Sequence, residues 1–281
     1  MNCAWQELLS VLPPPFRDEV NSMGKDSMQE LRLRLGKNAE LICGKNCVHL
    51  TRKVSQQDLQ FVLNTASKYS PWISNTLANG YLTAPGGHRI GVCGEAVVKE
   101  GVMTGIRQLA SMCIRVARDF PGLVNDRNLL TGSVLIIGQP GSGKTTFLRD
   151  LVRMRSEFAK GSIAVVDERG EIFPPFANFI TGQRTDVMTG CNKKQGIEML
   201  LRTMGPDTVA VDEITSEADC LGLLHAAWCG VSLIATAHAG SKKDLFSRPV
   251  YKPLINTKVF DMLVILQKDK SWVAERMDKV C

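Results

Sequence analysis

A glycine-rich loop at residues 138–146 carries the strongest chemical signal in the sequence. It follows the apolar segment 134–137 and leads into residues that favour a helix. Glycines here let the backbone present successive N–H groups to phosphate oxygens, because a Cβ would block the approach or the required dihedral angles. We therefore expect a Walker A loop that binds a nucleoside triphosphate. Its predicted binding residues are Gly138, Gln139, Pro140, Gly141, Ser142, Gly143, Lys144, Thr145 and Thr146.

Two side chains at the end of this loop supply charge and a metal ligand. Lys144 is expected to place its ammonium on the β- and γ-phosphates, and Thr145 to ligate Mg²⁺ with its hydroxyl. The helix that follows would direct its positive N-terminal end at the same anion. An accidental glycine-rich turn would not need this strand–loop–helix context. ATP and Mg²⁺ are the expected cofactors.

A second motif, at residues 209–213, supplies the carboxylates that such a site needs. The apolar segment ends in Asp212 and Glu213, which is the Walker B pattern. Asp212 is expected to hold the Mg²⁺ shell, and Glu213 to polarise the attacking water. Read alone, an acidic pair at a strand end also fits a surface turn, but the Walker A motif upstream favours the catalytic interpretation.

Two further strand ends carry polar residues. Residues 233–238 end in Thr236 and His238, which would lie at the edge of the sheet where ligands bind and could sense the γ-phosphate. An isolated histidine more often has a structural role. Residues 165–172 contain acids at 167, 168 and 171 around Arg169. This cluster fits a salt-bridged turn or a second acidic group that faces the phosphates of a metal-dependent hydrolase.

The elements that must position these motifs divide the chain into two domains, 1–120 and 121–281. The first reads as a small α+β domain, and the segment Phe120–Leu123 as a linker. After it, strands alternate with helices, which predicts an α/β fold with a buried parallel sheet. In the N-terminal domain we expect a short first helix, followed by a turn at prolines 13–15. The other expected elements are strands at 30–35, 40–43 and 112–116, a helix at 55–68 and a hairpin at 80–95. The expected C-terminal strands are 134–137, 162–166, 208–212 and 231–236, with a helix at 215–229.

Composition limits the possible classes of protein. The chain has 281 residues, of which 44% are hydrophobic and 22% charged, as in an ordinary globular protein. The longest apolar stretch, 221–237, is too short and too polar to span a bilayer, and no secretory signal is visible, so we expect a cytoplasmic protein. Nine cysteines without paired spacing indicate reduced thiols. Cys43, Cys47 and His49 suggest a metal site only weakly, because a second ligand pair is missing.

The net charge of +6 is unevenly distributed along the chain. Acidic residues outnumber basic ones in 126–241, whereas both flanking segments are basic. This excess could favour an anionic membrane or a nucleic acid, and it equally fits a solvated surface.

Taken in order, these motifs resemble those of the secretion-type ATPases that drive type II and type IV secretion and pili. Segments 28–36, 80–94 and 204–214 extend the resemblance over most of the chain. The motifs that match are the Walker A loop at 138–145, the aspartate box at 167–171, the Walker B motif at 212–213 and the histidine box at 236–238. The chain is shorter than most such ATPases, lacks a tetracysteine zinc insert and has Arg169-Gly170 where relatives often have proline.

This resemblance implies a RecA-like P-loop ATPase core with a smaller N-terminal α+β domain. It further implies Mg²⁺-dependent ATP hydrolysis by a hexamer. In the secretion ATPases, arginines of the N-terminal domain reach the nucleotide, and Arg89 and Arg115 are similar to them. The expected catalytic residues are Glu213, Lys144, Arg89, Arg115, Glu168 and His238. The expected metal ligands are Thr145 and Asp212.

Within this superfamily, the similarity is strongest to a family that acts in endospore formation. That implies a motor docked at the cytoplasmic face of the mother-cell membrane, which energises a channel between mother cell and forespore. No segment is expected to span the bilayer, so the attachment would be peripheral, through the membrane proteins of the channel.

Two other functions fit a P-loop core. One is a nucleic-acid-binding ATPase, although the sequence offers no aromatic and basic stacking platform and no nucleic-acid partner is expected. The other is a kinase or nucleotide switch, against which the Asp-Glu pair of the Walker B motif favours hydrolysis.

Overall fold

The computed structural model describes residues 1–67 and 80–277 and contains two compact units. The first unit comprises Met1–Asp119 together with Pro174–Phe179, and the second comprises Phe120–Phe173 and the chain from Ile180 onward. The short segment Pro174–Phe179 thus belongs to the first unit although its flanking residues belong to the second. In the described part of the chain, no helix combines the length and the apolar character that a membrane span requires.

The second unit is built on a seven-stranded sheet in the order β13-β12-β7-β11-β10-β8-β9. All neighbouring strands in it are parallel except the edge pair β12 and β13. Its strands are β7 (Val134–Gly138), β8 (Ile163–Asp167), β9 (Thr185–Thr189), β10 (Thr208–Ile214), β11 (Ser232–His238), β12 (Met262–Leu266) and β13 (Trp272–Arg276). Every residue of β7 and β8 is buried, as expected of strands covered on both faces.

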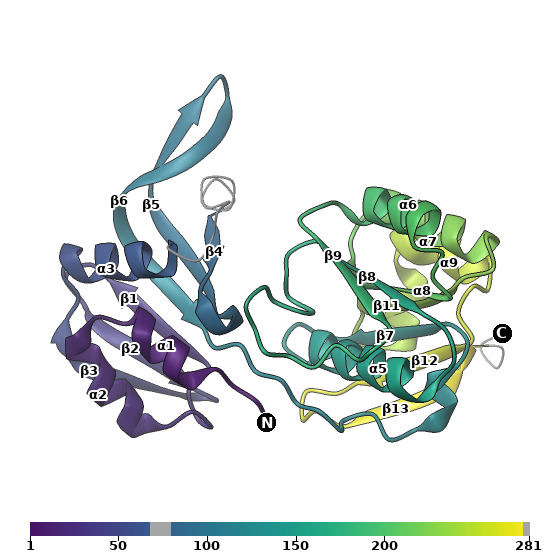
Figure 1. The fold of residues 1–281 in the computed structure, drawn as a ribbon, viewed down its shortest axis with the longest axis horizontal. Helices are drawn as coiled ribbons and strands as arrows, with labels where there is room; N and C mark the ends of the chain where they lie inside the picture. Colours follow the sequence, from purple (N-terminus) through teal and green to yellow (C-terminus); the bar gives the residue numbers. More distant parts are fainter. Residues whose placement is uncertain (68–79, 278–281) are drawn as a thin grey trace. The chain divides into compact units, whose positions relative to one another are not determined.

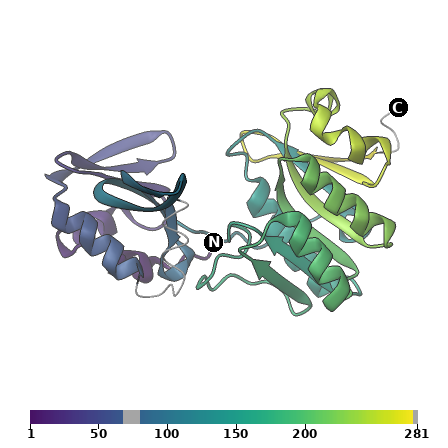
Figure 2. The same ribbon diagram turned by 90° about the horizontal axis from the view of Figure 1, so that it is seen from above.

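Helices cover both faces of this sheet (Figures 1 and 2). One core cluster joins alternate strand residues such as Leu135, Val166 and Val209 to Ile197 of α6 and Leu223 of α7. The helix α5 packs on the other face, with Phe147, Leu148 and their neighbours buried. The helices of this unit are α5 (Lys144–Phe158), α6 (Lys193–Thr203), α7 (Glu217–Trp228), α8 (Lys242–Ser247) and α9 (Lys252–Asn256), with 3₁₀ turns at Arg127–Leu130 and Pro249–Tyr251.

The first unit has a six-stranded antiparallel sheet in the order β3-β2-β1-β6-β5-β4. Its strands are β1 (Glu30–Arg34), β2 (Asn38–Cys43), β3 (Asn46–Lys53), β4 (Tyr81–Thr83), β5 (Arg89–Lys99) and β6 (Val102–Arg115). Its helices are α1 (Trp5–Val11), α2 (Pro14–Met23) and α3 (Gln56–Ser67), with a 3₁₀ turn at Pro85–Gly87. Figure 1 shows β5 and β6 continuing as a two-stranded ribbon beyond the other strands.

The predicted α/β class and parallel core strands are confirmed, with boundaries shifted by one or two residues. The helix predicted from residue 55 is α3, which Ser55 and Asp58 cap by reciprocal hydrogen bonds. Its predicted last residue, Lys68, lies outside the described residues. The predicted short first helix is α1, and the turn after it is confined to Leu12 and Pro13, because Pro14 already begins α2. Proline is tolerated in the first turn of a helix, because a backbone N–H at that position has no acceptor within the helix and proline therefore loses no hydrogen bond there.

Candidate nucleotide-binding site

The glycine-rich loop joins β7 to α5 as the sequence predicts. Gly141 and Gly143 have φ of 75° and 99°, a region that residues with a Cβ seldom occupy. At Gly138 a Cβ would lie 2.4 Å from Ser142 Oγ, so the close turn needs glycine. The Ser142 hydroxyl is buried and has no hydrogen-bond partner among the described residues. A buried donor of this kind suits a ligand oxygen. Gln139 and Pro140 lie exposed in the loop, and Thr146 follows in the first turn of α5.

The Lys144 ammonium lies against the loop that it follows. Its Nζ donates to Gly138 O at 3.0 Å and Gln139 O at 3.2 Å, and it lies 3.0 Å from His238 Nδ1. Burial lowers the pKa of Lys144, while Asp212 and Glu213 act in the opposite direction. Since an ammonium can only donate, Nδ1 of His238 accepts this bond.

The Asp212 carboxylate joins the loop to the neighbouring strand end. Thr145 Oγ1 donates to Asp212 Oδ2 at 2.6 Å, and Thr236 Oγ1 donates to Oδ1 at 2.5 Å. A hydroxyl and a carboxylate oxygen, supplemented by phosphates and water, form the kind of set that holds Mg²⁺ in nucleotide sites. The residues present therefore fit the predicted metal ion. In the described part of the chain, no group of three or more His, Cys, Asp or Glu gathers as an all-protein metal site would require.

Glu213 is directed by a distortion of its strand. Pairing between β10 and β11 shifts register between Val211 and Ile214, and Glu213 has a φ of 56°. Its backbone N–H donates to Thr236 Oγ1 at 2.7 Å rather than to a strand carbonyl. Bulges and left-handed non-glycine residues often aim side chains at functional sites. The sequence motif did not reveal this bulge.

The carboxylate of Glu213 connects the Walker B strand to the Walker A lysine through a histidine. His238 Nε2 lies 3.0 Å from Glu213 Oε1, and Arg169 Nη1 lies 3.5 Å from Oε2. Because Nδ1 accepts from Lys144, the hydrogen-bond pattern assigns the proton of a neutral ring to Nε2. His238 thus links Lys144 to Glu213. The β11 register places His238 opposite Gly138, which explains the proximity.

Asp167 of the aspartate box holds a turn of its own backbone. Its carboxylate accepts hydrogen bonds from the N–H groups of Glu171, Ile172 and Phe173 at 2.8 to 2.9 Å. Burial raises the pKa of Asp167 to about 6, against the effect of these bonds. The arginine in the box is not its partner, because Arg169 pairs with Glu213. Asp167 therefore shapes the chain that follows β8.

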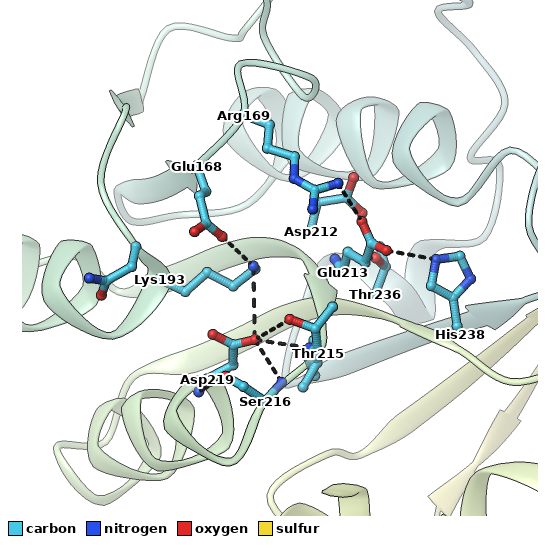
Figure 3. Close-up of polar contacts among 12 residues, drawn as sticks. Glu168, Arg169, Lys193, Asp212, Glu213, Thr215, Ser216, Asp219, Thr236 and His238 are labelled. Carbon is cyan, nitrogen blue, oxygen red and sulfur yellow. Dashed lines mark hydrogen bonds and ion pairs between the residues drawn. The ribbon is translucent and has the colours of Figure 1, made fainter. Parts of the chain in front are cut away.

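Glu168 lines a small polar cavity and pairs with a lysine that sequence reasoning missed. Lys193 Nζ lies 2.6 Å from Glu168 Oε2 and 3.9 Å from Asp219 Oδ2 (Figure 3). The cavity has a volume of about 120 Å³. Its lining residues are Val166, Asp167, Glu168, Arg169, Glu171, Lys193, Asp212, Glu213 and Thr215. Lys193 begins α6 in no recognised motif, so only the folded chain reveals it.

Arg89 and Arg115 belong to the first unit and are cross-strand neighbours. They are Cα partners in the pairing of β5 with β6, so their side chains share one face of the sheet. The Arg89 guanidinium lies 4.2 Å from the Tyr81 ring centroid, and Arg115 Nε lies 3.7 Å from Glu30 Oε2. The structure thus places these two arginines side by side on the sheet of the first unit, and gathers the remaining predicted site residues in the second unit.

Comparisons with solved structures identify the class of fold. The chain superimposes on the ATPase DotB of Legionella pneumophila with a TM-score of 0.58 and 18% identity, over 89% of this chain and 76% of that one. It superimposes on the pilus retraction motor PilT with a TM-score of 0.62 and 16% identity, over 88% and 76%. The architecture is therefore the RecA-like fold of the secretion ATPases, as predicted.

Sequence comparison then gives the particular family. Residues 7–275 match the family described as sporulation stage III, protein AA, and the chain belongs to it. Stage III sporulation protein AA of Bacillus subtilis is 36% identical over 285 residues, which cover 94% of this chain and 91% of that protein. The protein seedling plastid development 1 of Arabidopsis thaliana is 26% identical over 257 residues, and the chain spans 35% of its length. The predicted resemblance is confirmed.

Proposed function

We propose that this chain is an Mg²⁺-dependent ATPase that acts as a motor of the secretion ATPase type. The observation that carries the proposal is the continuous contact from Lys144 through His238 to Glu213, beside an Asp212 carboxylate bonded to Thr145. These contacts bring a cation suited to phosphate, a hydroxyl–carboxylate pair suited to a metal ion and a carboxylate suited to act as a base to one sheet edge. The printed names of the structural neighbours, an ATPase and a pilus retraction motor, point the same way.

Each step of hydrolysis can be assigned to a group of this chain. Lys144 exchanges its hydrogen bonds to Gly138 O and Gln139 O for hydrogen bonds to phosphate oxygens. The new bonds are stronger, because a charged phosphate oxygen accepts more strongly from an ammonium than a neutral carbonyl does. A bound Mg²⁺ would offset the negative charge that develops on the phosphates. Thr145 and Asp212 would hold that ion. Glu213 orients a water molecule and accepts a proton from it. As the water oxygen bonds to the γ-phosphorus, the bond between that phosphorus and the β,γ-bridging oxygen breaks.

The pairing of Glu213 with His238 and Arg169 gives the base a defined direction before substrate arrives. The carboxylate receives one contact at each oxygen. Because the carboxylate is already oriented, fewer groups of the site need to rearrange when the reaction occurs. His238 can sense the phosphate chain, because a phosphate that draws Lys144 away breaks the hydrogen bond between Lys144 and His238 Nδ1. Glu168, held by Lys193, completes the polar wall of the cavity.

The wider role that we propose follows from the family. The motor works as a hexamer in which Arg89 and Arg115 act on the nucleotide of a neighbouring subunit. A planar guanidinium suits this task, because it can bridge phosphate oxygens. The motor energises a channel between mother cell and forespore. It lies peripherally at the cytoplasmic face of the mother-cell membrane and is held there by the channel's membrane proteins.

The test of the enzymatic proposal is phosphate release by the purified full chain with ATP and Mg²⁺. We expect turnover by the wild type and none above background by Lys144→Ala. Absence of turnover in the wild type, alone and with the membrane proteins of the channel, would overturn the ATPase proposal. Addition of DNA or RNA separates the motor from a nucleic-acid-stimulated ATPase, because the motor should ignore both.

A further inference from the structure

The turn between β12 and β13 holds one of its lysines in a fixed direction. Gln267 N donates to Ser271 O at 2.9 Å, and Lys270 N donates to Gln267 O at 3.2 Å. Asp269 Oδ1 accepts from Ser271 N at 3.0 Å and from its hydroxyl at 2.6 Å. Lys270 has a φ of 74°, which is uncommon for a residue with a long side chain. These bonds fix the backbone from which the Lys270 side chain extends.

Both ends of this turn are attached next to the Walker A loop. At its start, Leu266 is the register partner of Gly138, the first glycine of the loop. At its end, Trp272 packs edge-on against Phe147 of α5, with ring centroids 5.2 Å apart and planes at 68°. Figure 1 shows β12 and β13 beside β7 and α5. The fold therefore places this turn beside the loop.

The Lys270 side chain reaches the loop. Its ammonium donates a hydrogen bond to the carbonyl oxygen of Gly141, and its Cδ would lie 3.8 Å from a Cβ built on Gly143. Gly141 stands three residues before Lys144, in the part of the loop whose N–H groups are expected to surround phosphate. An ammonium has three N–H donors, and the Gly141 carbonyl takes one of them.

We propose that Lys270 is a second phosphate-binding lysine of the nucleotide site, supplied by the β12–β13 turn. The inference rests on the proposed nucleotide binding and adds a residue that no motif identified. Lys144 contributes positive charge from the helix side of the loop, and Lys270 contributes it from the C-terminal turn. A phosphate oxygen bound at the loop can attract an ammonium more strongly than a neutral carbonyl does, because the bond then joins two charged groups. The ligand class is a nucleotide with two or more phosphates.

The experiment compares Lys270→Met with Lys268→Met, since both lysines are exposed residues of the same turn. Lys268 has no assigned role in the site. A fluorescent ATP analogue and MgATP competition measure affinity, and phosphate release measures kcat and KM. We expect Lys270→Met to weaken MgATP affinity and raise KM about 3- to 10-fold, the discounted strength of an exposed charge-assisted bond. Its kcat should change less than KM, Lys270→Arg should recover part of the affinity, and Lys268→Met should match the wild type.

The outcomes separate this inference from the proposed function. Unchanged affinity in Lys270→Met, with wild-type binding intact and Lys144→Ala deficient, overturns the role of Lys270 and leaves the ATPase proposal standing. Equal losses in Lys270→Met and Lys268→Met also overturn it, because they indicate only general surface charge. A wild type that does not bind MgATP overturns both proposals. A lower melting temperature in Lys270→Met without an Arg rescue assigns the lysine a structural role and contradicts the inference.

Discussion

The candidate nucleotide-binding edge of the second unit and the arginine pair of the first unit (Arg89 and Arg115) gather charged groups by different means. At the edge, Gly138, Glu213 and His238 lie at the ends of the adjacent strands β7, β10 and β11. Parallel strands place their carboxyl ends at one edge, so motifs far apart in the chain meet there. In the first unit, Arg89 and Arg115 meet because two antiparallel strands adopt one register.

The two regions also differ in how firmly their side chains are held. Lys144 is 6% exposed and contacts His238 as well as two loop carbonyls. The side chain of Arg115 is 66% exposed and has an ion pair at 3.7 Å. An exposed ion pair is worth little, so Arg115 can exchange its partner at small cost. A rigid edge suits binding and proton transfer, whereas a loosely held arginine such as Arg115 suits contacts that form and break.

The largest expected effect lies at the rigid edge. Glu213→Gln removes the proton acceptor and keeps the shape of the side chain, so turnover should fall on the order of 1,000-fold while MgATP stays bound. Phosphate release and ATP affinity measure the two effects separately. Glu217→Gln, at the exposed start of α7, is the control and should behave as the wild type. Equal loss of ATP affinity in Glu213→Gln and Lys144→Ala would contradict the assignment of Glu213 to chemistry.

The arginine pair should show a smaller effect that depends on a second subunit. Removing one hydrogen-bond donor that stabilises developing negative charge lowers turnover about 100-fold, and we expect a loss of this size for Arg115→Ala. Mixing Arg115→Ala subunits with Lys144→Ala subunits should restore activity above either variant alone, if Arg115 acts on a neighbour's nucleotide. Arg107→Ala, on the same strand and paired with Glu95, should retain activity and give no complementation effect. Demonstrated co-assembly without recovery would argue against action between subunits.

A further prediction concerns the wall of the cavity. Lys193→Met removes the ion pair that holds Glu168, and we expect kcat to fall about tenfold, the lower end for groups that orient others at a metal site. KM should change less, because the ion pairs of Lys193 within the described residues are with Glu168 and Asp219, which lie outside the Walker A loop. Lys194→Met, its exposed neighbour, is the matched control. If Lys193→Met keeps full kcat, Glu168 does not need this partner.

The last expected effect is on stability rather than on turnover, and it comes from Asp167. Its pKa is raised to about 6 in the folded chain, from an ordinary 3.8, because it is buried. The protonated form is therefore favoured by folding, and its contribution to stability is present below about pH 4 and lost as pH rises through 6. Urea unfolding from pH 4 to 7 should show this fall in the wild type and a flatter profile in Asp167→Asn. The exposed Asp186→Asn serves as the control, and an unchanged slope in Asp167→Asn would refute the assignment.

A good part of this molecule could be predicted from its residues. The Walker A loop, the Asp-Glu strand end and the Thr236–His238 strand end were each placed on elements that the structure confirms. Short-range chemistry explains this success, because apolar runs specify buried strands and glycines specify a close phosphate-binding turn. Three strands of the second sheet were missed. The strand β9 has mostly exposed residues and β13 follows no motif, so periodicity alone did not reveal them. The strand β12 is an apolar run like β7 and could have been predicted, although it follows no motif.

The sequence by itself determined the order of the motifs and the residue types that can bind phosphate and magnesium. Only the tertiary structure decided which of these groups contact one another. Arg169 pairs with Glu213 instead of with the acids beside it in the chain, and His238 connects two motifs through its two ring nitrogens. Lys193 and Lys270 stand outside every motif and enter the site through packing and register. Residue spacing fixes local geometry, whereas contacts between distant residues depend on how strands align and helices pack, which no local pattern records.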